Sequence, residues 1–204
     1  MTRSKILVAG LFATLLFAAT SRAQELPRNE VSVQGTGFFT KDSDNNGIIQ
    51  HSTDSGGLLV SYRNLFSRWF GADLSYGFTR NTQLNFTPVG ASRVQSDVHQ
   101  TTAALVVHTP GRVLGLRPFA LAGAGALTFS PINNFGGIAI LADTQAKAAF
   151  VYGGGADYDI NDHFALRLEY RGLVYGRPDF GLTPLNSDTV THTAQPSAGF
   201  VIRF

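Results

Sequence analysis

The sequence predicts an all-β protein, an eight-stranded antiparallel up-and-down transmembrane β-barrel. Three observations predict this fold. Segments that alternate apolar and polar side chains recur along the chain, the connections between them alternate in length, and the last segment closes with an aromatic residue, Phe204. Alternation with period two is typical of a strand whose two faces meet different surroundings.

The first 23 residues are expected to be a secretory signal peptide. Arg3 and Lys5 precede an apolar run over residues 6–19, and the small residues Ser21 and Ala23 occupy the positions that a signal peptidase reads. An apolar run of this length is too short to span a bilayer comfortably as a helix. The sequence therefore predicts a signal peptide over 1–23, a single barrel domain over 24–204, and export to the bacterial cell outer membrane.

The composition narrows the class of protein further. Removal of the signal leaves 13 basic and 14 acidic side chains, which gives no support for nucleic-acid binding. The absence of cysteine excludes disulfides and thiolate metal sites. Hydrophobic residues make up 44% of the chain, yet the longest apolar stretch after the signal, 119–129, is short and rich in glycine.

Eight strands are expected near residues 30–40, 55–63, 70–82, 95–109, 117–129, 145–160, 163–176 and 191–204. The third strand sets Ala72, Leu74, Tyr76 and Phe78 against Asp73, Ser75, Gly77 and Thr79. The fourth is less regular, because Ala103, Leu105 and Val107 form one apolar face while Val98 and Val106 lie on the other.

The last three strands alternate more clearly. The sixth sets Ala148, Phe150, Tyr152, Ala156 and Tyr158 against Lys147, Ala149, Gly153, Gly155 and Asp157. The seventh sets Phe164, Leu166, Leu168, Tyr170 and Val174 against Ala165, Arg167, Glu169 and Arg171. The eighth sets Ala198, Phe200 and Ile202 against Gln195, Ser197, Gly199 and Arg203, with Val201 as an exception.

The connections between strands are alternately long and short. Segments 41–54, 83–94, 130–144 and 177–190 are long and rich in Asn, Asp, Ser, Gly and Pro, whereas "NLFSRW", "PGRVLGLR" and "ND" are shorter. An even number of strands then puts both termini on the side of the short turns. Short periplasmic turns and longer outer loops are typical of outer-membrane barrels.

Alternation alone leaves open whether the apolar face points outward to lipid or inward, as in a soluble lipocalin-like barrel. The polar face mixes glycine and alanine with ionic residues of both signs, which suits a narrow lumen, and an apolar last residue suits a membrane boundary. Aromatic residues near strand ends are expected to form interfacial girdles: Phe70, Phe78, Phe129, Phe150, Tyr158, Phe164, Tyr175, Phe200 and Phe204. We therefore expect the apolar face to point outward.

The last strand resembles the C-terminal assembly signal of the small outer-membrane β-barrel proteins, a family that includes the OmpA-like transmembrane barrel. Ser197, Gly199 and Phe204 match the family pattern, and Ile202 stands where an aromatic residue is expected. The resemblance covers the mature chain and implies contact with outer-membrane lipid. It also implies transient partners, the barrel-assembly machinery and periplasmic chaperones, and a monomeric barrel.

The ionic residues of the polar face are the candidate site: Asp73, Lys147, Asp157, Arg167, Glu169, Arg171 and Arg203. They are expected either to form an internal salt-bridge network or to line a selective pore. Eight strands leave an interior just wide enough for side chains to fill, which favours the network.

No catalytic, cofactor or metal site is expected. "DSGG" (54–57) resembles the nucleophile region of trypsin-like proteases, but the distant histidine base and orienting aspartate are missing. The five histidines show no metal-ligand spacing and are expected in surface loops or girdles. The predicted function is that of a non-enzymatic structural or surface protein; the alternatives are a narrow channel, a lipid A-modifying enzyme and a soluble periplasmic ligand carrier.

Overall fold

The computed structural model describes residues 29–40, 43–45, 48–52, 54–87, 90–109, 111–131, 144–176 and 190–204. The predicted signal peptide lies outside these residues. No helix in this part of the chain is long and apolar enough to cross a membrane.

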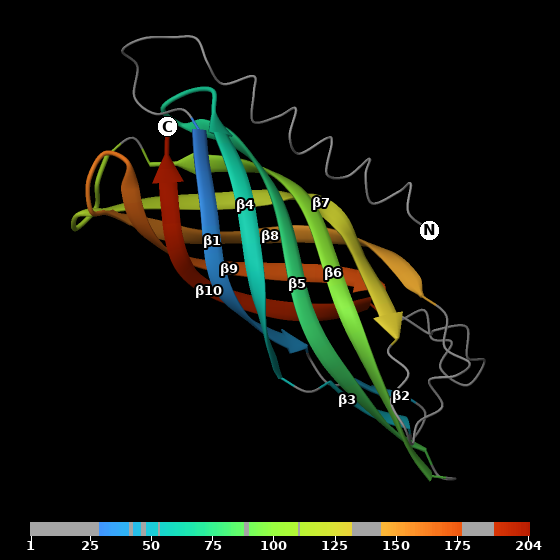
Figure 1. The fold of residues 1–204 in the computed structure, drawn as a ribbon. Coiled ribbons are helices and arrows are strands. Elements are labelled where there is room, and N and C mark those ends of the chain that lie inside the picture. Colours follow the sequence, from blue (N-terminus) through green and yellow to red (C-terminus); the bar gives the residue numbers. More distant parts are fainter. Residues whose placement is uncertain are drawn as a thin grey trace, which may run out of the picture.

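The described residues form one antiparallel sheet that closes into a barrel (Figure 1). Neighbouring strands follow one another around the barrel from β1 through β4 to β10, and β1 pairs with β10 to close it. The predicted fold class, a closed eight-stranded up-and-down barrel, is confirmed. The barrel strands are β1 (Asn29–Thr40), β4 (Ser55–Leu65), β5 (Phe70–Thr87), β6 (Gly90–His108), β7 (Leu116–Pro131), β8 (Gln145–Asp159), β9 (Phe164–Gly176) and β10 (Val190–Arg203). Two short strands, β2 (Ser43–Asn45) and β3 (Ile48–Ser52), lie beside β5.

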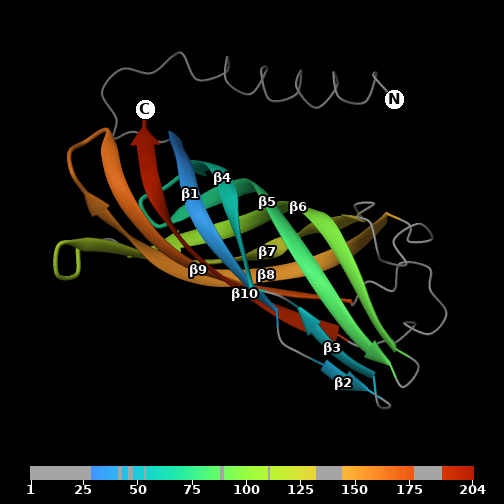
Figure 2. The same ribbon diagram turned by 60° about the horizontal axis from the view of Figure 1, so that its bottom comes forward.

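The first and last strands of the barrel, β1 and β10, pair beside the short turns. The amide of Asn29 donates to the carbonyl of Phe204 at 3.1 Å, and the amide of Phe204 donates to the carbonyl of Asn29 at 2.9 Å. The C-terminus and the start of β1 lie at the same end as the β4–β5, β6–β7 and β8–β9 turns (Figures 1 and 2). The predicted side of the termini is confirmed.

Two of the predicted long connections are wrong in part. Segment 41–54 contains β2 and β3, and β3 pairs with β5 from Ile49–Phe86 to Ser52–Gln83. Segment 83–94 is nearly all strand, because β5 runs to Thr87 and β6 starts at Gly90. These strands extend past the far end of the barrel (Figure 2). Both segments are rich in polar residues and resemble loops in sequence, although the backbone still pairs. Segments 132–143 and 177–189 lie outside the described residues.

The predicted faces of the strands are confirmed where the alternation is strong. On β9, Leu166, Leu168 and Tyr170 are exposed, whereas Arg167, Glu169 and Arg171 are buried. On β6, Leu105 and Val107 are exposed, and the exceptions Val98 and Val106 point inward and are buried. The apolar face therefore points outward along the wall.

The aromatic prediction is wrong for two residues. Phe129 and Tyr175 are buried inside the barrel, with ring centroids 5.8 Å apart, because they share the inward parity of β7 and β9. Phe78 is half-buried on the outward face. The other predicted girdle residues are exposed: Phe70, Phe150, Tyr158, Phe164, Phe200 and Phe204.

Inward glycines allow the β8 and β9 backbones to approach closely. A Cβ on Gly153 would lie 2.1 Å from the carbonyl oxygen of Tyr170, and one on Gly155 would lie 2.2 Å from that of Leu168. Glycine is the residue that tolerates such an approach. These glycines therefore serve the close packing of the two strands.

Candidate functional site

The interior of the barrel is the candidate site, and its side chains form two layers. The ionic layer lies toward the end that holds the termini and consists of Glu30, Arg63, Asp73, Arg117, Asp157, Asp159, Arg167, Glu169, Arg171 and Arg203. The apolar layer lies toward the opposite end and consists of Phe38, Val98, Leu127, Phe129, Leu173 and Tyr175.

Asp157 on β8 is a centre of the ionic layer. Its carboxylate accepts two hydrogen bonds from Arg167, from Nε at 2.7 Å and from Nη2 at 2.9 Å. It accepts a third from Arg203 Nη2 at 3.1 Å, and Arg117 Nη2 lies 3.9 Å away. Bidentate arginine–carboxylate pairs are the stronger kind of ion pair, and here the pair is fully buried.

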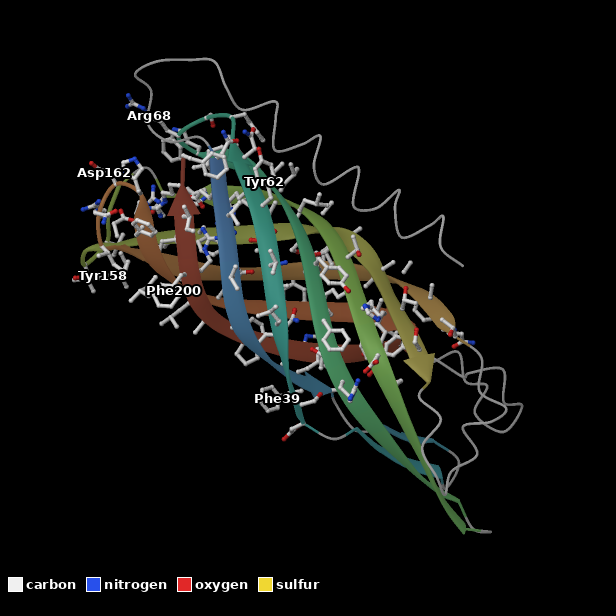
Figure 3. The ribbon with its side chains drawn as sticks, in the orientation of Figure 1. Phe39, Tyr62, Arg68, Tyr158, Asp162 and Phe200 are labelled. Carbon is white, nitrogen blue, oxygen red and sulfur yellow. The ribbon has the colours of Figure 1, made fainter. Side chains whose placement is uncertain are left out.

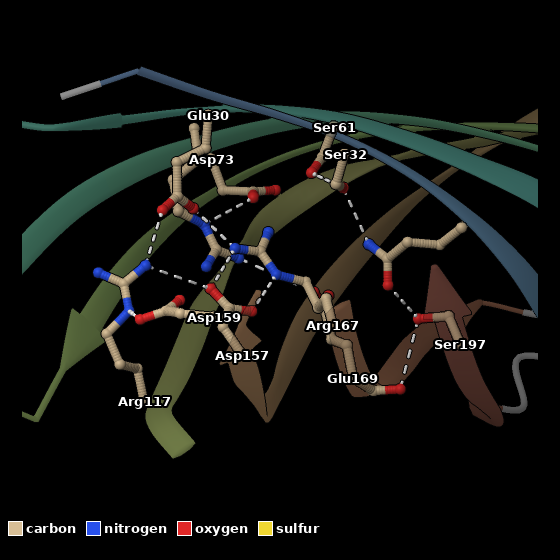
Figure 4. Close-up of polar contacts among 12 residues, drawn as sticks. Glu30, Ser32, Ser61, Asp73, Arg117, Asp157, Asp159, Arg167, Glu169 and Ser197 are labelled. Carbon is tan, nitrogen blue, oxygen red and sulfur yellow. Dashed lines mark hydrogen bonds and ion pairs between the residues drawn. The ribbon is translucent and has the colours of Figure 1, made fainter. Parts of the chain in front are cut away.

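Glu30 on β1 joins the same arginines from another strand (Figure 4). Its carboxylate accepts from Arg167 Nη2 at 2.7 Å and from Arg203 Nε at 2.8 Å. Arg117 Nη2, on β7, donates to it at 3.4 Å. Since β7 lies opposite β1 in the closed barrel, this contact crosses the bore.

A second ionic group lies around Asp73 on β5. Asp73 accepts from Arg63 Nε and from Arg171 Nη2, each at 3.1 Å. Arg171 also donates to Glu169, and Arg63 Nη2 lies 3.8 Å from the second oxygen of Glu169. Arg171 on β9 reaches Asp73 across the bore, because β9 lies opposite β5.

Charges in the ionic layer balance. Its members are five arginines and five carboxylates. A buried ion is stabilised only when it is paired and hydrogen-bonded. This arrangement therefore suits a packed interior.

Phe119 on β7 packs against the arginines of the ionic layer. The Cζ atom of Arg63 lies 4.2 Å from the centre of its ring, and that of Arg167 lies 5.0 Å away. His108 packs against the same ring, with centroids 5.6 Å apart, and is buried. The prediction of a surface or girdle position is therefore wrong for His108, which has the inward parity of β6.

A belt of neutral polar side chains separates the two layers. Gln100 on β6 and Gln195 on β10 exchange two amide hydrogen bonds of 3.2 and 3.1 Å across the bore. Gln34 donates to Ser32 Oγ at 3.0 Å and accepts from Ser197 Oγ at 2.9 Å. These amides and hydroxyls satisfy one another without charge.

The apolar layer lies toward the opposite end of the barrel. Phe38, Leu127 and Leu173 are fully buried there. Tyr175 keeps its ring among them while its hydroxyl hydrogen-bonds the hydroxyl of Thr193 at 2.9 Å.

The structure brings six of the seven predicted ionic residues together: Asp73, Asp157, Arg167, Glu169, Arg171 and Arg203. Lys147 points inward but lies toward the other end of β8, and it makes no ion pair within the described part of the chain. Glu30, Arg63, Arg117 and Asp159 were not predicted. Strand parity could have found Glu30, because Ser32 and Gln34 share its face, whereas Arg63 and Arg117 border turns.

Known outer-membrane barrels share this architecture. A family model described as outer membrane protein beta-barrel domain matches residues 9–204. The chain belongs to this family. No curated protein matches the chain.

Solved structures of outer-membrane barrels are similar to this member of the family in fold. The outer membrane protein OprG from Pseudomonas aeruginosa is 14% identical, with 89% of this chain and 97% of that chain covered and a TM-score of 0.63. Neisserial surface protein A is 14% identical, with 89% and 100% covered and a TM-score of 0.60. The outer membrane protein AlkL, solved in DMPC lipid bilayers, is 16% identical, with 91% and 94% covered and a TM-score of 0.56.

On the outer surface of this family member, two histidines pair with tyrosines. The Tyr76 hydroxyl lies 2.6 Å from His99 Nδ1, and the Tyr152 hydroxyl lies 2.9 Å from His192 Nε2. Both tyrosines are exposed on the outward face. His163 is exposed in the β8–β9 turn, and the side chain of His51 lies outside the described residues.

The four residues of the predicted assembly signal lie on and just after β10. Ser197 points inward to Gln34. Gly199 lies where a Cβ would meet the carbonyl oxygen of Val33 at 2.1 Å. Ile202 and Phe204 are exposed on the outward side, as is Phe200 (Figure 3).

Proposed function

We propose that the protein is a non-enzymatic outer-membrane barrel with a structural or surface role, and that its lumen is closed to ions and solutes. One observation carries this proposal: side chains from opposite strands meet across the bore. Arg117 contacts Glu30, Arg171 contacts Asp73, and Gln100 exchanges hydrogen bonds with Gln195.

The charge balance argues for a plug over a selective channel. A selective pore presents a ring of one charge or of dipoles to the passing ion. Here the arginine and carboxylate groups are directed at one another, and Arg167 and Asp157 are fully buried. An ion in transit would have to separate buried pairs, which is costly.

Planar-bilayer recording of the refolded, purified protein tests the closed lumen. We expect little or no conductance. Truncation of both Gln100 and Gln195 to alanine should raise the frequency of openings, whereas Leu168→Ala, on the outward face, should leave it unchanged. Large, long-lived openings of the unmodified protein would overturn the proposal in favour of a narrow channel.

The outward histidines support a non-enzymatic role. A lipid-modifying serine or threonine hydrolase needs a histidine free to act as the base for its nucleophile. One ring nitrogen of His99 and one of His192 instead bond tyrosine hydroxyls, those of Tyr76 and Tyr152, rather than the hydroxyl of a serine or threonine. Mass spectrometry of lipid A incubated with the folded protein should show no change; loss or gain of an acyl chain would refute this role.

We also infer that residues 1–23 are a cleaved signal, that the mature chain lies as a monomer in the lipid of the bacterial outer membrane, and that Ser197, Gly199, Ile202 and Phe204 form an assembly signal. Periplasmic chaperones and the barrel-assembly machinery would then be transient partners. Export and the N-terminus of the mature protein can be read by mass spectrometry of the membrane fraction. Phe204→Ala should slow assembly in cells more than Phe200→Ala, and equal rates would argue against the signal.

A further inference from the structure

The β6–β7 turn carries an apolar side chain at a strained position. Val113 and Leu116 exchange backbone hydrogen bonds of 2.9 and 3.0 Å, which leaves Leu114 and Gly115 as a two-residue loop. Both have positive φ, 54° and 82°, as in a type I′ turn. Asn, Asp or Gly suits the first loop position, and a bulky residue there is uncommon. Leu114 is also 97% exposed, so its side chain gains nothing from packing within the barrel.

The turn presents an apolar face outward. Thr109 bonds Pro118 and Val113 pairs with Leu116, so the turn is longer on its β6 side than on its β7 side. Val113 therefore lies opposite Leu116 on the outward face. Both are exposed, and Leu116 pairs with the exposed Tyr158 of β8. This surface continues the lipid-facing band beyond the end of the barrel wall.

The other face of the turn is fixed to the barrel. Arg112 Nη2 bonds the carboxylate of Asp159 at 2.7 Å, and Asp159 also pairs with Arg203 in the ionic layer. The hydroxyl of Thr109 donates to the carbonyl of Gly111 at 3.0 Å. The tip is therefore held in one position relative to the wall while Val113 and Leu114 remain uncovered.

We propose that Val113 and Leu114 insert into the headgroup–acyl boundary of the lipid leaflet at the short-turn end of the barrel, where they act as a membrane anchor. The continuity of their surface with the lipid-facing band identifies lipid, rather than a protein, as the occupant. Apolar side chains beside a cation are typical of interfacial segments. Arg112 lies next to them with a side chain that is 60% exposed, so its guanidinium can face lipid phosphate while Nη2 stays paired with Asp159.

Fluorescence of a single labelled cysteine tests the anchor, since the chain has no cysteine of its own. The folded variants V113C and L114C carry an environment-sensitive NBD label in vesicles of phosphatidylethanolamine and phosphatidylglycerol. We expect blue-shifted emission, quenching by spin-labelled lipid, and several-fold weaker quenching by aqueous iodide than at D162C. Asp162 is the matched control because it lies in the exposed β8–β9 turn at the same end of the barrel (Figure 3).

A gel shift on boiling shows that each variant is folded before it is measured. Iodide quenching at 113 and 114 as strong as at 162, without quenching by spin-labelled lipid, would place the tip in water and overturn the proposal. Leu114→Asn provides a second measurement without a label. It removes the apolar group and suits the backbone, so hydrogen exchange at Val113 and Leu116 in vesicles should become faster if lipid protects the tip. Unchanged or slower exchange would count against the anchor.

Discussion

The centres of the ionic and apolar layers of the lumen are buried to the same degree but are stabilised in different ways. Arg167 in the first and Phe129 in the second are each 1% exposed. Arg167 depends on Asp157 and Glu30, because an unpaired buried charge is costly. Phe129 depends on close packing, where each lost contact costs a little. The two layers therefore differ in what burial requires of a side chain, which is charge compensation in the ionic layer and close packing in the apolar layer.

The difference predicts how each layer fails. Removing one member of the ionic layer leaves its partners uncompensated, so the loss should exceed the value of the deleted contact. Removing a methyl group from the apolar layer should cost its burial plus a cavity term. Matched pairs of variants can separate these two behaviours.

The largest effect is expected at the centre of the ionic layer. Asp157→Asn removes the negative charge that Arg167 and Arg203 share, and should lower the free energy of unfolding by about 3–5 kcal/mol. Urea unfolding of the detergent-folded protein, followed by gel mobility, measures this loss. Asp97→Asn is the control, because Asp97 pairs with Arg80 at the same 2.7 Å but in an exposed position on the outer surface. Its loss should be much smaller, since solvent screens the pair, and equal losses would refute the distinction.

The apolar layer should fail through volume. Leu173→Ala deletes a fully buried side chain on β9 and should cost about 2–5 kcal/mol, depending on how far the site collapses. Leu168→Ala makes the same deletion on the same strand at an outward position that is 68% exposed. Lipid or detergent can fill the space there, so its unfolding midpoint should change far less. If Leu168→Ala lowers the unfolding midpoint as much as Leu173→Ala, side chains on the outward face contribute as much to stability as those of the apolar layer.

Sequence reasoning could predict the ionic layer better than the apolar one, for a physical reason. Arg167 and Leu168 are adjacent and chemically opposite, so strand parity places one on the inward face and the other on the outward face. Phe129 and Tyr175 suit either an interfacial girdle or a dry lumen by residue type, and it is their inward parity on β7 and β9 that decides between the two. The partners Glu30 and Arg63 lie near strand ends, where composition does not fix the boundary. The contacts across the bore depend on barrel closure, which no local pattern encodes.

The boundary between the layers can be tested with a double-mutant cycle. Gln100→Met or Gln195→Met alone leaves one buried amide without its partner across the bore, at a cost of about 1–3 kcal/mol. The double replacement removes both polar groups and should cost less than the sum of the two single changes. Unfolding midpoints of the four proteins give the coupling. Additive losses would mean that the two glutamines are satisfied independently and that the belt does not join β6 to β10.

The smallest effect concerns the wall beside this boundary. Pairing of β1 with β10 runs from Glu30–Arg203 to Thr36–Ser197 and resumes only at Phe39–Ala194. Pro196 lies in the gap, has no amide hydrogen to donate, and faces β1 with a carbonyl that accepts from Thr36 Oγ1 at 3.1 Å.

Pro196→Val restores an amide at this point of the wall. The new hydrogen bond should stabilise by about 0.5–1.5 kcal/mol, while loss of the proline constraint on the unfolded chain offsets about 0.4–1 kcal/mol of this. Global stability should therefore change little, and the readout must be local. Hydrogen exchange at Gly37 and Phe39 should slow in Pro196→Val and stay unchanged in Ala198→Val, which enlarges an outward side chain on β10 without adding an amide. Faster or unchanged exchange in Pro196→Val would show that the missing amide does not weaken the pairing of β1 with β10. The wall would then be as stable between these two strands as between the others.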